Sequence, residues 1–270
     1  MTPVVHGLFI YPIKGCTAVE LASSEVGSTG LTHDRDFMLV AAHDGGFLSQ
    51  RKIPAMAVLR PTVQDDGARL LVSAPGRPDY EHKTRFDGDR RPVAVHWWHG
   101  EGVDQGDEAA EWFSAALDSP CRLVRVPPDL DRQLNEEGQV GFADAHALLM
   151  TSLSSLDGLN ERILQRGAEP IPMNRFRPNV VVSGWPEPHT EDLVRQVTIG
   201  TTEFGYARKC VRCRVPTVNQ ELGQTAGHEP TRTLADYRRA DGGVVFGMKA
   251  KVLQHGTLAV GDHLDVTAWA

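Results

Sequence analysis

Short apolar runs alternate with turn residues at roughly ten-residue spacing through the first part of the chain. The runs are VVHGLFIY, DFMLVAA, AVLRPTV, ARLLVSA and PVAVHWW, and the turns between them include DGG, DDG, FDGD and HGEG. Runs this short and this regularly interrupted suit β-strands joined by tight turns. Residues 1 to about 105 are therefore predicted to form an antiparallel barrel or sandwich.

Helical patterns enter after this region and mix with further strands. DEAAEWFSAALD and TRTLADYRRA have apolar residues at helical spacing, the second with Thr231 or Thr233 as a cap, and ALLMTSLSSLDGLNERI reads as a strand followed by a helix. Ser154 or Ser155 is the expected N-cap of that helix. Strands are predicted at CRLVRVP, NVVVSGW, QVTIGTTEFGYA and GTLAVGDHLDVTAW.

The segment VPPDLDRQLNEEGQV is rich in proline and charge, and it is predicted to be a long loop or linker. Its position divides the chain into a first unit over residues 1–125 and a second over residues 126–270. The fold class expected from these patterns is α+β, mostly β with a few helices. No internal repeat is visible in the sequence.

The net charge and the lengths of the apolar runs argue against nucleic-acid and membrane partners. The formal net charge is −7, which argues against a nucleic-acid partner but leaves room for a local basic pocket that binds an anionic small molecule. No apolar run approaches the roughly 18 residues of a membrane span, so no membrane partner is expected. Four cysteines without a disulfide framework suit a reducing compartment. The protein is expected to be cytoplasmic, with free thiols.

The segment ARKCVRCRVPT concentrates thiols and cations. Cys210 and Cys213 lie among Arg208, Lys209, Arg212 and Arg214. A thiol acts as a nucleophile or metal ligand in its thiolate form, and neighbouring cations favour that form. Because alternate residues of a strand point to opposite faces, only some of these cations can face a given sulfur atom.

Several interpretations of this cysteine pair are open at the level of local sequence. The two residues can be small buried core residues. A structural zinc site is less favoured because the chain has no second CxxC or HxxxH, and a thioredoxin-like pair would need a helix after its first cysteine. A soft thiolate can also ligate a redox metal or a metal cofactor. The local sequence does not decide among these four interpretations.

Three other segments place cations at strand ends. YPIKGC has Lys14 and Gly15 at a turn, HDRDFMLV has Arg35 between two aspartates, and NRFRPNVVVSG has Arg177 just before an apolar strand. Each has an ordinary explanation as a surface cation or a salt bridge. Together they are the residue types that bind phosphate groups.

Eight motifs in order carry a family resemblance. They are YPIKGC, HDRDFMLV, SQRKIPAM, FADAHALLMTSLSSLDGLN, RFRPNVVVSG, ARKCVRCRVPTVNQELG, EPTRTLADYRR and GTLAVGD. The chain resembles, over nearly its whole length, the MOSC family, named for the C-terminal domain of molybdenum cofactor sulfurase. It is most similar to the branch with the mitochondrial amidoxime-reducing component and its bacterial counterparts. The resemblance implies an N-terminal β-barrel module, residues 1–125, packed on a barrel-like MOSC domain, residues 126–270.

The resemblance also implies a cofactor and its ligands. Family members hold the molybdenum cofactor, a pterin with a dithiolene and a terminal phosphate, and Cys213 matches the cysteine that ligates molybdenum. Cys210 receives no role. The other positions that match cofactor-contacting residues are Lys14, Gly15, Arg35, Asp144, Ala145, His146, Arg177, Val211 and Arg212. Gly15 stands where a serine is common, and Pro216 and Asn219 stand where relatives often carry Thr and Asp.

The activity implied is reduction of N-hydroxylated compounds such as amidoximes, hydroxylamines and N-hydroxylated bases, with Asp144 or His146 relaying protons. Because no cysteine follows Cys213, the electrons are expected to come from a separate iron–sulfur, flavoprotein or cytochrome donor. Two alternatives stay open. One is a carrier of sulfur or of the cofactor that uses a persulfide on Cys213, and the other is a metal-free binding module with the CxxC in its core.

Overall fold

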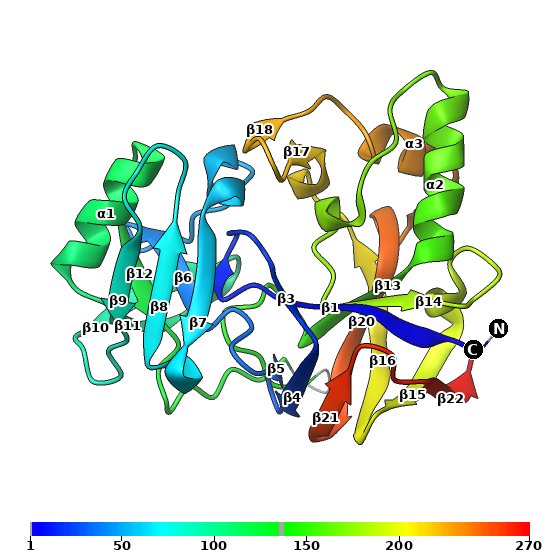
Figure 1. The fold of residues 1–270 in the computed structure, drawn as a ribbon, viewed down its shortest axis with the longest axis horizontal. Coiled ribbons are helices and arrows are strands. Elements are labelled where there is room, and N and C mark those ends of the chain that lie inside the picture. The colour runs from blue at the N-terminus through cyan, green and yellow to red at the C-terminus, as the bar shows by residue number, and fades with distance from the viewer. Residues whose placement is uncertain (1, 135–137) are drawn as a thin grey trace.

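Nine strands drawn from both ends of the chain form the largest sheet (Figure 1). The structure is a computed structural model that describes residues 2–134 and 138–270. The strand order is β22–β15–β16–β20–β13–β14–β1–β3, with β19 paired to β20. These strands are β1 (Val4–Ile10), β3 (Val19–Leu21), β13 (Leu148–Ser152), β14 (Val180–Ser183), β15 (Val194–Ile199), β16 (Thr202–Val211), β19 (Arg239–Ala240), β20 (Gly243–Gln254) and β22 (Leu264–Trp269).

The sheet curls until β1 approaches β22. Val4 and His263 form an isolated bridge, and Val5 N donates to Asp262 O over 2.9 Å, but among the described residues no ladder closes the sheet into a barrel. The enclosed interior is apolar because alternate side chains of the strands point inward. Its buried members include Leu8, Met150, Val180, Phe204 and Met248. The predicted α+β class, mostly β, is confirmed.

The first half of the chain builds two other sheets. The five-stranded sheet has the order β10–β11–β12–β6–β2, and the three-stranded sheet has the order β7–β8–β9. Their strands are β2 (Ile13–Lys14), β6 (Phe37–Ala41), β7 (Arg60–Gln64), β8 (Arg69–Ser73), β9 (Tyr80–Lys83), β10 (Arg90–Val95), β11 (Trp98–Asp104) and β12 (Cys121–Arg125). The helix predicted at 107–118 is present as α1 (Asp107–Leu117), and its buried Ala109, Phe113 and Leu117 join the core between these sheets.

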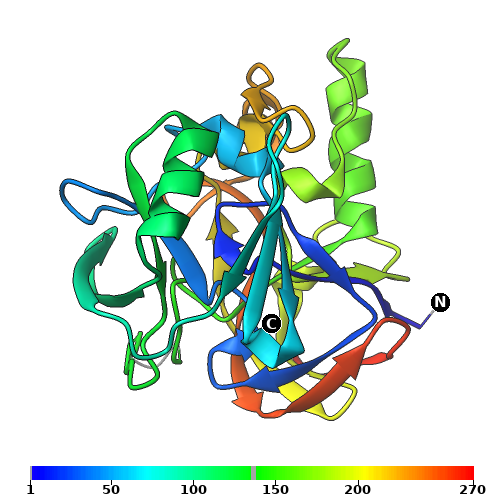
Figure 2. The same ribbon diagram turned by 60° about the vertical axis from the view of Figure 1, so that its left-hand side comes forward.

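Helix α2 (Leu153–Gln165) packs against the second half and lies at the edge of the molecule in both views (Figures 1 and 2). Leu159 and Ile163 lie four residues apart and so share one face, which is buried against the stacked rings of Phe176 and Phe246. The N-cap predicted at Ser154 or Ser155 is wrong. Ser152 caps the helix instead, because its side chain accepts a hydrogen bond from Ser155 N over 3.2 Å.

The remaining elements are short. Two small sheets combine β4 (Ser23–Gly27), β5 (Gly30–Leu31) and β21 (Gly256–Ala259), and β17 (Val218–Asn219) with β18 (Gln224–Thr225). The other helices are α3 (Thr231–Tyr237) and the 3₁₀ turns η1 (Pro54–Val58), η2 (Asp65–Gly67), η4 (Met173–Arg175), η5 (Thr190–Leu193) and η6 (Val215–Thr217). Neither Thr231 nor Thr233 is the N-cap of α3, since that position is occupied by Pro230.

The loop predicted at 126–140 includes residues 135–137, which lie outside the described residues. Its other residues form no helix or strand beyond a bridge between Gln133 and Gln139. In the described ranges, no helix is long and apolar enough to cross a membrane.

The N-terminal segment crosses from one half of the molecule to the other. Strand β1 pairs with β14, and β4 pairs with β21, although β14 and β21 lie in the second half of the sequence. Strand β2, only three residues after β1, pairs with β6 in the first half. The division at residues 125 and 126 remains a prediction, and the crossing brings the Lys14–Gly15 turn between the two halves.

Leu8→Ala is expected to destabilise the protein by about 2–5 kcal/mol, since Leu8 is fully buried on a strand that pairs on both sides. The matched control is His6→Ala on the same strand, whose side chain is exposed and whose loss should change the free energy of unfolding by less than about 0.5 kcal/mol. Denaturant unfolding measures both. Equal effects of the two substitutions would show that β1 is not held in this sheet.

Candidate functional site

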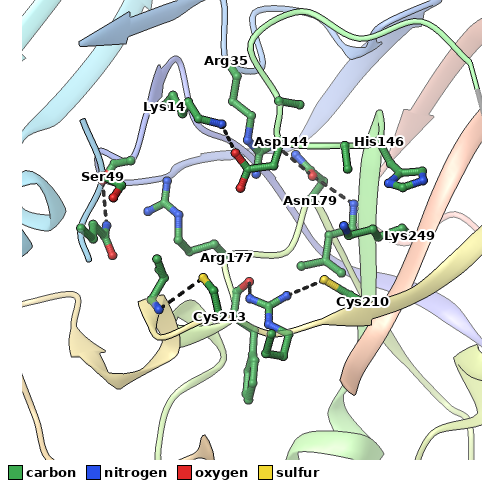
Figure 3. A pocket seen from close by; sticks show the side chains of 18 of the residues that line it. Lys14, Arg35, Ser49, Asp144, His146, Arg177, Asn179, Cys210, Cys213 and Lys249 are labelled. Carbon is green, nitrogen blue, oxygen red and sulfur yellow. Dashed lines mark hydrogen bonds and ion pairs between the residues drawn. The ribbon is translucent and has the colours of Figure 1, made fainter. Parts of the chain in front are cut away.

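A cleft between the two halves collects side chains from distant segments (Figure 3). Its walls come from the Lys14–Gly15 turn, residues 47–51, residues 143–146, 148 and 149, the segment that precedes β14, and the end of β16 with the residues that follow it. The ten predicted site residues all line this cleft: Lys14, Gly15, Arg35, Asp144, Ala145, His146, Arg177, Val211, Arg212 and Cys213. Their individual roles remain predictions.

Lys14 is buried in the cleft wall and paired with an acid. Its ammonium donates to Phe142 O over 2.8 Å and forms an ion pair with Asp144, which also lies 3.3 Å from His96 Nε2. Burial lowers the pKa of Lys14, and the Asp144 charge opposes that change. Burial would raise the pKa of Asp144, but Lys14 and His96 hold that pKa well below its ordinary range. Asp144 is therefore ionised at neutral pH and accepts hydrogen bonds rather than donating them.

Gly15 follows Lys14 in a conformation that disfavours other residues. Its φ is +87°, and a Cβ placed there would lie 2.8 Å from Met56 Cε. A serine at this position would be strained here.

Two arginines stack on one tyrosine ring. The guanidinium carbons of Arg35 and Arg177 lie 4.8 and 4.1 Å from the centroid of the Tyr11 ring. Arg35 also forms an ion pair with Asp34 and donates to Asn179 Oδ1 over 3.3 Å. Both arginines have φ near +57°, at 58° and 56°, which is uncommon outside glycine and frequent at functional sites. Burial lowers the pKa of Arg177 and raises that of Tyr11 to about 12.

The two cysteines of the CxxC segment have different environments. Cys210 is buried on β16, whereas Cys213 lies beyond the end of that strand and is exposed in the cleft. Arg212 lies between them, and its guanidinium donates to Cys210 Sγ over 2.9 Å and to Phe176 O over 2.7 Å. Val215 N donates to Cys213 Sγ over 3.5 Å. The pair thus combines one anchored thiol with one accessible thiol.

The positions of Cys210 and Cys213 can be compared with the interpretations of the CxxC segment given above. The core interpretation fits Cys210 but not the exposed Cys213. A thioredoxin-like helix does not follow the first cysteine, since β16 continues to Val211 and the 3₁₀ turn η6 begins only at Val215. Across residues 2–134 and 138–270, no three His, Cys, Asp or Glu side chains group closely enough to hold a metal ion.

Five polar or aromatic residues that support the cleft were not among the predicted site residues. Tyr11 and Asn179 hold the arginines, His96 contacts Asp144, and Gln50 and Gln220 pair with each other. Four of the five lie inside the quoted motifs, so their presence in those motifs could have identified them as site residues. His96 lies on the turn between β10 and β11, where no motif pointed.

Comparison with known proteins agrees with this architecture. Residues 2–120 match the model of the MOSC N-terminal beta barrel domain, and residues 137–265 match that of the MOSC domain. The chain belongs to the MOSC family. This MOSC protein is 32% identical to mitochondrial amidoxime-reducing component 1 of Mus musculus, over 96% of its own length and 80% of that relative.

Two further relatives extend the comparison. Mitochondrial amidoxime reducing component 2 of Bos taurus is 32% identical, with 96% of this MOSC chain and 81% of the relative aligned. Molybdenum cofactor sulfurase of Oryza sativa subsp. japonica is 29% identical over 90% of this chain, but the match spans only 32% of that larger protein. Relatives of two different names, amidoxime-reducing component and molybdenum cofactor sulfurase, therefore match most of this chain.

Asp144→Asn is expected to lower the pKa of Lys14 further, because the anion that favours the ammonium form is removed while the burial remains. The pH dependence of Lys14 acetylation, followed by mass spectrometry, measures this change. Asp36→Asn is the matched control, since Asp36 contacts His33 and Arg125 and forms no ion pair with Lys14. An unchanged Lys14 profile in Asp144→Asn would contradict the ion pair.

Proposed function

We propose that this protein is a molybdenum-cofactor-dependent reductase of N-hydroxylated compounds. The observation that carries the proposal is the exposed thiol of Cys213 in a cleft lined by Lys14, Arg35, Arg177 and Arg212. The relatives named amidoxime-reducing components, aligned over 96% of the chain, support the reaction class. Amidoximes, hydroxylamines and N-hydroxylated bases are the proposed substrates.

The residues present fit an anionic metal cofactor. Among the described residues, neither Arg177 nor Arg212 forms an ion pair with a carboxylate, so both can bind an external anion. Arginine suits phosphate because its planar fork offers paired donors. A thiolate is a soft ligand for a metal that is already chelated by sulfur. Cys213 would ligate molybdenum, and the cations would bind the phosphate end of the pterin.

The backbone beside Cys213 and the opposite wall would complete this binding site. Gly15, Val211 and Ala145 bring backbone groups to the cleft, and strand alternation leaves the Val211 side chain 40% exposed. Because these segments belong to the Lys14–Gly15 turn, β16 and the loop before β13, the site is built from both halves of the chain.

The proposed reaction consumes two electrons and two protons, and converts an N-hydroxyl group into an N–H group and water. When bound, the cofactor would supply the two-electron transfer. The protein would supply the thiolate, orient the substrate and deliver protons. Asp144, held ionised by Lys14 and His96, is a weak base and is suited to orient the substrate or water by accepting hydrogen bonds, which leaves His146 as the proposed proton donor.

Cys213→Ala is expected to lose molybdenum and to lower amidoxime reduction by more than about 100-fold, because the only protein sulfur proposed as a ligand is gone. Elemental analysis and a benzamidoxime assay with an artificial electron donor measure the two effects. Cys210→Ala is the matched control and should retain most of both, since Cys210 is buried and its sulfur contacts Arg212, which Phe176 O also holds. Full activity of Cys213→Ala would exclude the proposed ligand.

The electron source is proposed to be a separate protein of the iron–sulfur, flavoprotein or cytochrome type. An iron–sulfur cluster takes about four cysteine ligands, and three of the four cysteines here are buried. The purified holoprotein should give no turnover with NADH or NADPH as sole reductant, and should turn over when reduced viologen dye is added. Direct oxidation of NADH by the protein alone would contradict a separate donor.

A second candidate function is a carrier of sulfur or of the cofactor, with a persulfide on Cys213. The observation that favours it is the alignment of 90% of this chain with a molybdenum cofactor sulfurase. Mass spectrometry after incubation with a sulfur donor decides between the two. A stable persulfide on Cys213, together with bound molybdenum and no reductase activity, would support the carrier.

A further inference from the structure

Two glutamines from opposite halves of the chain form a reciprocal amide pair beside the cleft. Gln50 Nε2 donates to Gln220 Oε1 over 3.0 Å, and Gln220 Nε2 donates to Gln50 Oε1 over 2.8 Å. The residues are 170 positions apart in sequence. Gln50 lies in the loop between β6 and η1 and is 1% exposed, while Gln220 lies in the hairpin of β17 and β18.

Each amide makes further hydrogen bonds that extend the pair. Gln50 Nε2 also donates to Gly15 O over 2.7 Å, which fixes the turn that carries Lys14. Gln220 Nε2 donates to Val218 O over 3.1 Å, and Gln220 Oε1 accepts from Arg177 Nη1 over 3.3 Å. A single network therefore joins the Lys14–Gly15 turn, the β17–β18 hairpin and Arg177.

The hairpin that carries Gln220 is a compact unit. Asn219 Oδ1 accepts from Glu221 N over 2.9 Å and from Leu222 N over 3.0 Å. Gly223 packs so closely on η1 that a Cβ added there would lie 3.2 Å from Ala55 Cα. Figure 1 shows β17 and β18 reaching from the second half toward the first. The glutamine pair thus joins two segments that are already in contact.

Gln220 is also the side chain that orients a cleft arginine. Arg177 stacks on Tyr11, has a positive φ and, within the described chain, hydrogen-bonds to no side chain other than Gln220. A neutral amide can accept from the guanidinium without neutralising its charge, whereas a carboxylate would compete with an external anion. This choice leaves the positive charge of Arg177 directed at the cleft.

We propose that the Gln50–Gln220 pair is a positioning element that fastens the β17–β18 hairpin to the first half and so holds Arg177 in place to bind an anionic cofactor. This inference rests on the proposed function, because the anion is taken to be the molybdenum cofactor. Loss of the pair would free the hairpin and loosen Arg177, and the cofactor would leave the cleft faster.

The main test measures the rate of molybdenum loss from the holoprotein by elemental analysis after timed gel filtration. Gln50→Ala and Gln220→Ala should each lose molybdenum about 3- to 10-fold faster than wild type, and the double variant should be slower than the product of the two single effects predicts, since the same pair is broken in all three. Gln224→Ala, an exposed residue of the same hairpin, is the matched control and should behave as wild type.

A second variant of Gln220 tests whether the neutral charge of its amide matters for Arg177. Gln220→Glu keeps the size and shape of the side chain, but it loses the donor to Gln50 and places an anion beside Arg177. It should lose molybdenum at least as fast as Gln220→Ala. Retention equal to wild type in Gln220→Glu would overturn the role assigned to the neutral amide.

A measurement on the cofactor-free protein tests the positioning role separately from the proposed function. Hydrogen exchange of residues 218–225 in the cofactor-free protein should quicken in Gln50→Ala and stay unchanged in Gln224→Ala. Absence of molybdenum in wild type would overturn the proposed function together with the cofactor role of the pair. Molybdenum bound by wild type and lost at one common rate by all variants, or hairpin exchange that does not respond to Gln50→Ala, would overturn the positioning role alone.

Discussion

The cleft depends on keeping several positive side chains close together in a partly buried space. Like charges repel more strongly when water is excluded, so Lys14, Arg35, Arg177 and Arg212 each need a partner that offsets the repulsion. Lys14 and Arg35 have aspartates, while among the described residues Arg177 and Arg212 contact aromatic rings, an amide, a sulfur and a carbonyl but no carboxylate. The first two charges are balanced internally. The other two are the charges that we propose to bind an anion.

The crossing of the N-terminal segment explains how these charges come together. Strand β1 is built into the sheet of the second half, and β2 immediately enters the sheet of the first half. The turn between them and the residues that follow must therefore lie where the halves meet. Tyr11, which begins this crossing, is buried by that contact and provides the surface on which Arg35 and Arg177 stack.

The patterns of the sequence allowed the fold class to be predicted, and the family resemblance implied the cleft residues, whose motifs lie at strand ends. The contacts between these motifs could not be predicted from the sequence. The reciprocal pair of Gln50 and Gln220 depends on two loops 170 positions apart meeting in one register, which no local pattern encodes. The helix cap at Ser152 was missed for a related reason. Three serines lie within four positions, and only the packing that presents Ser152 to Ser155 N distinguishes them.

The CxxC segment shows how a strand end can give two identical residues different chemistry. The alternation of side chains along β16 buries Cys210 and exposes Val211. Because β16 ends at Val211, the position of the Cys213 thiol is not fixed by this alternation. Arg212 turns back and is fixed by Cys210 Sγ and Phe176 O before any ligand arrives. A preorganised cation beside an accessible thiol lowers the reorganisation needed on binding. The spacing of two residues between the cysteines is therefore the distance that allows one sulfur to anchor the arginine while the other faces the cleft.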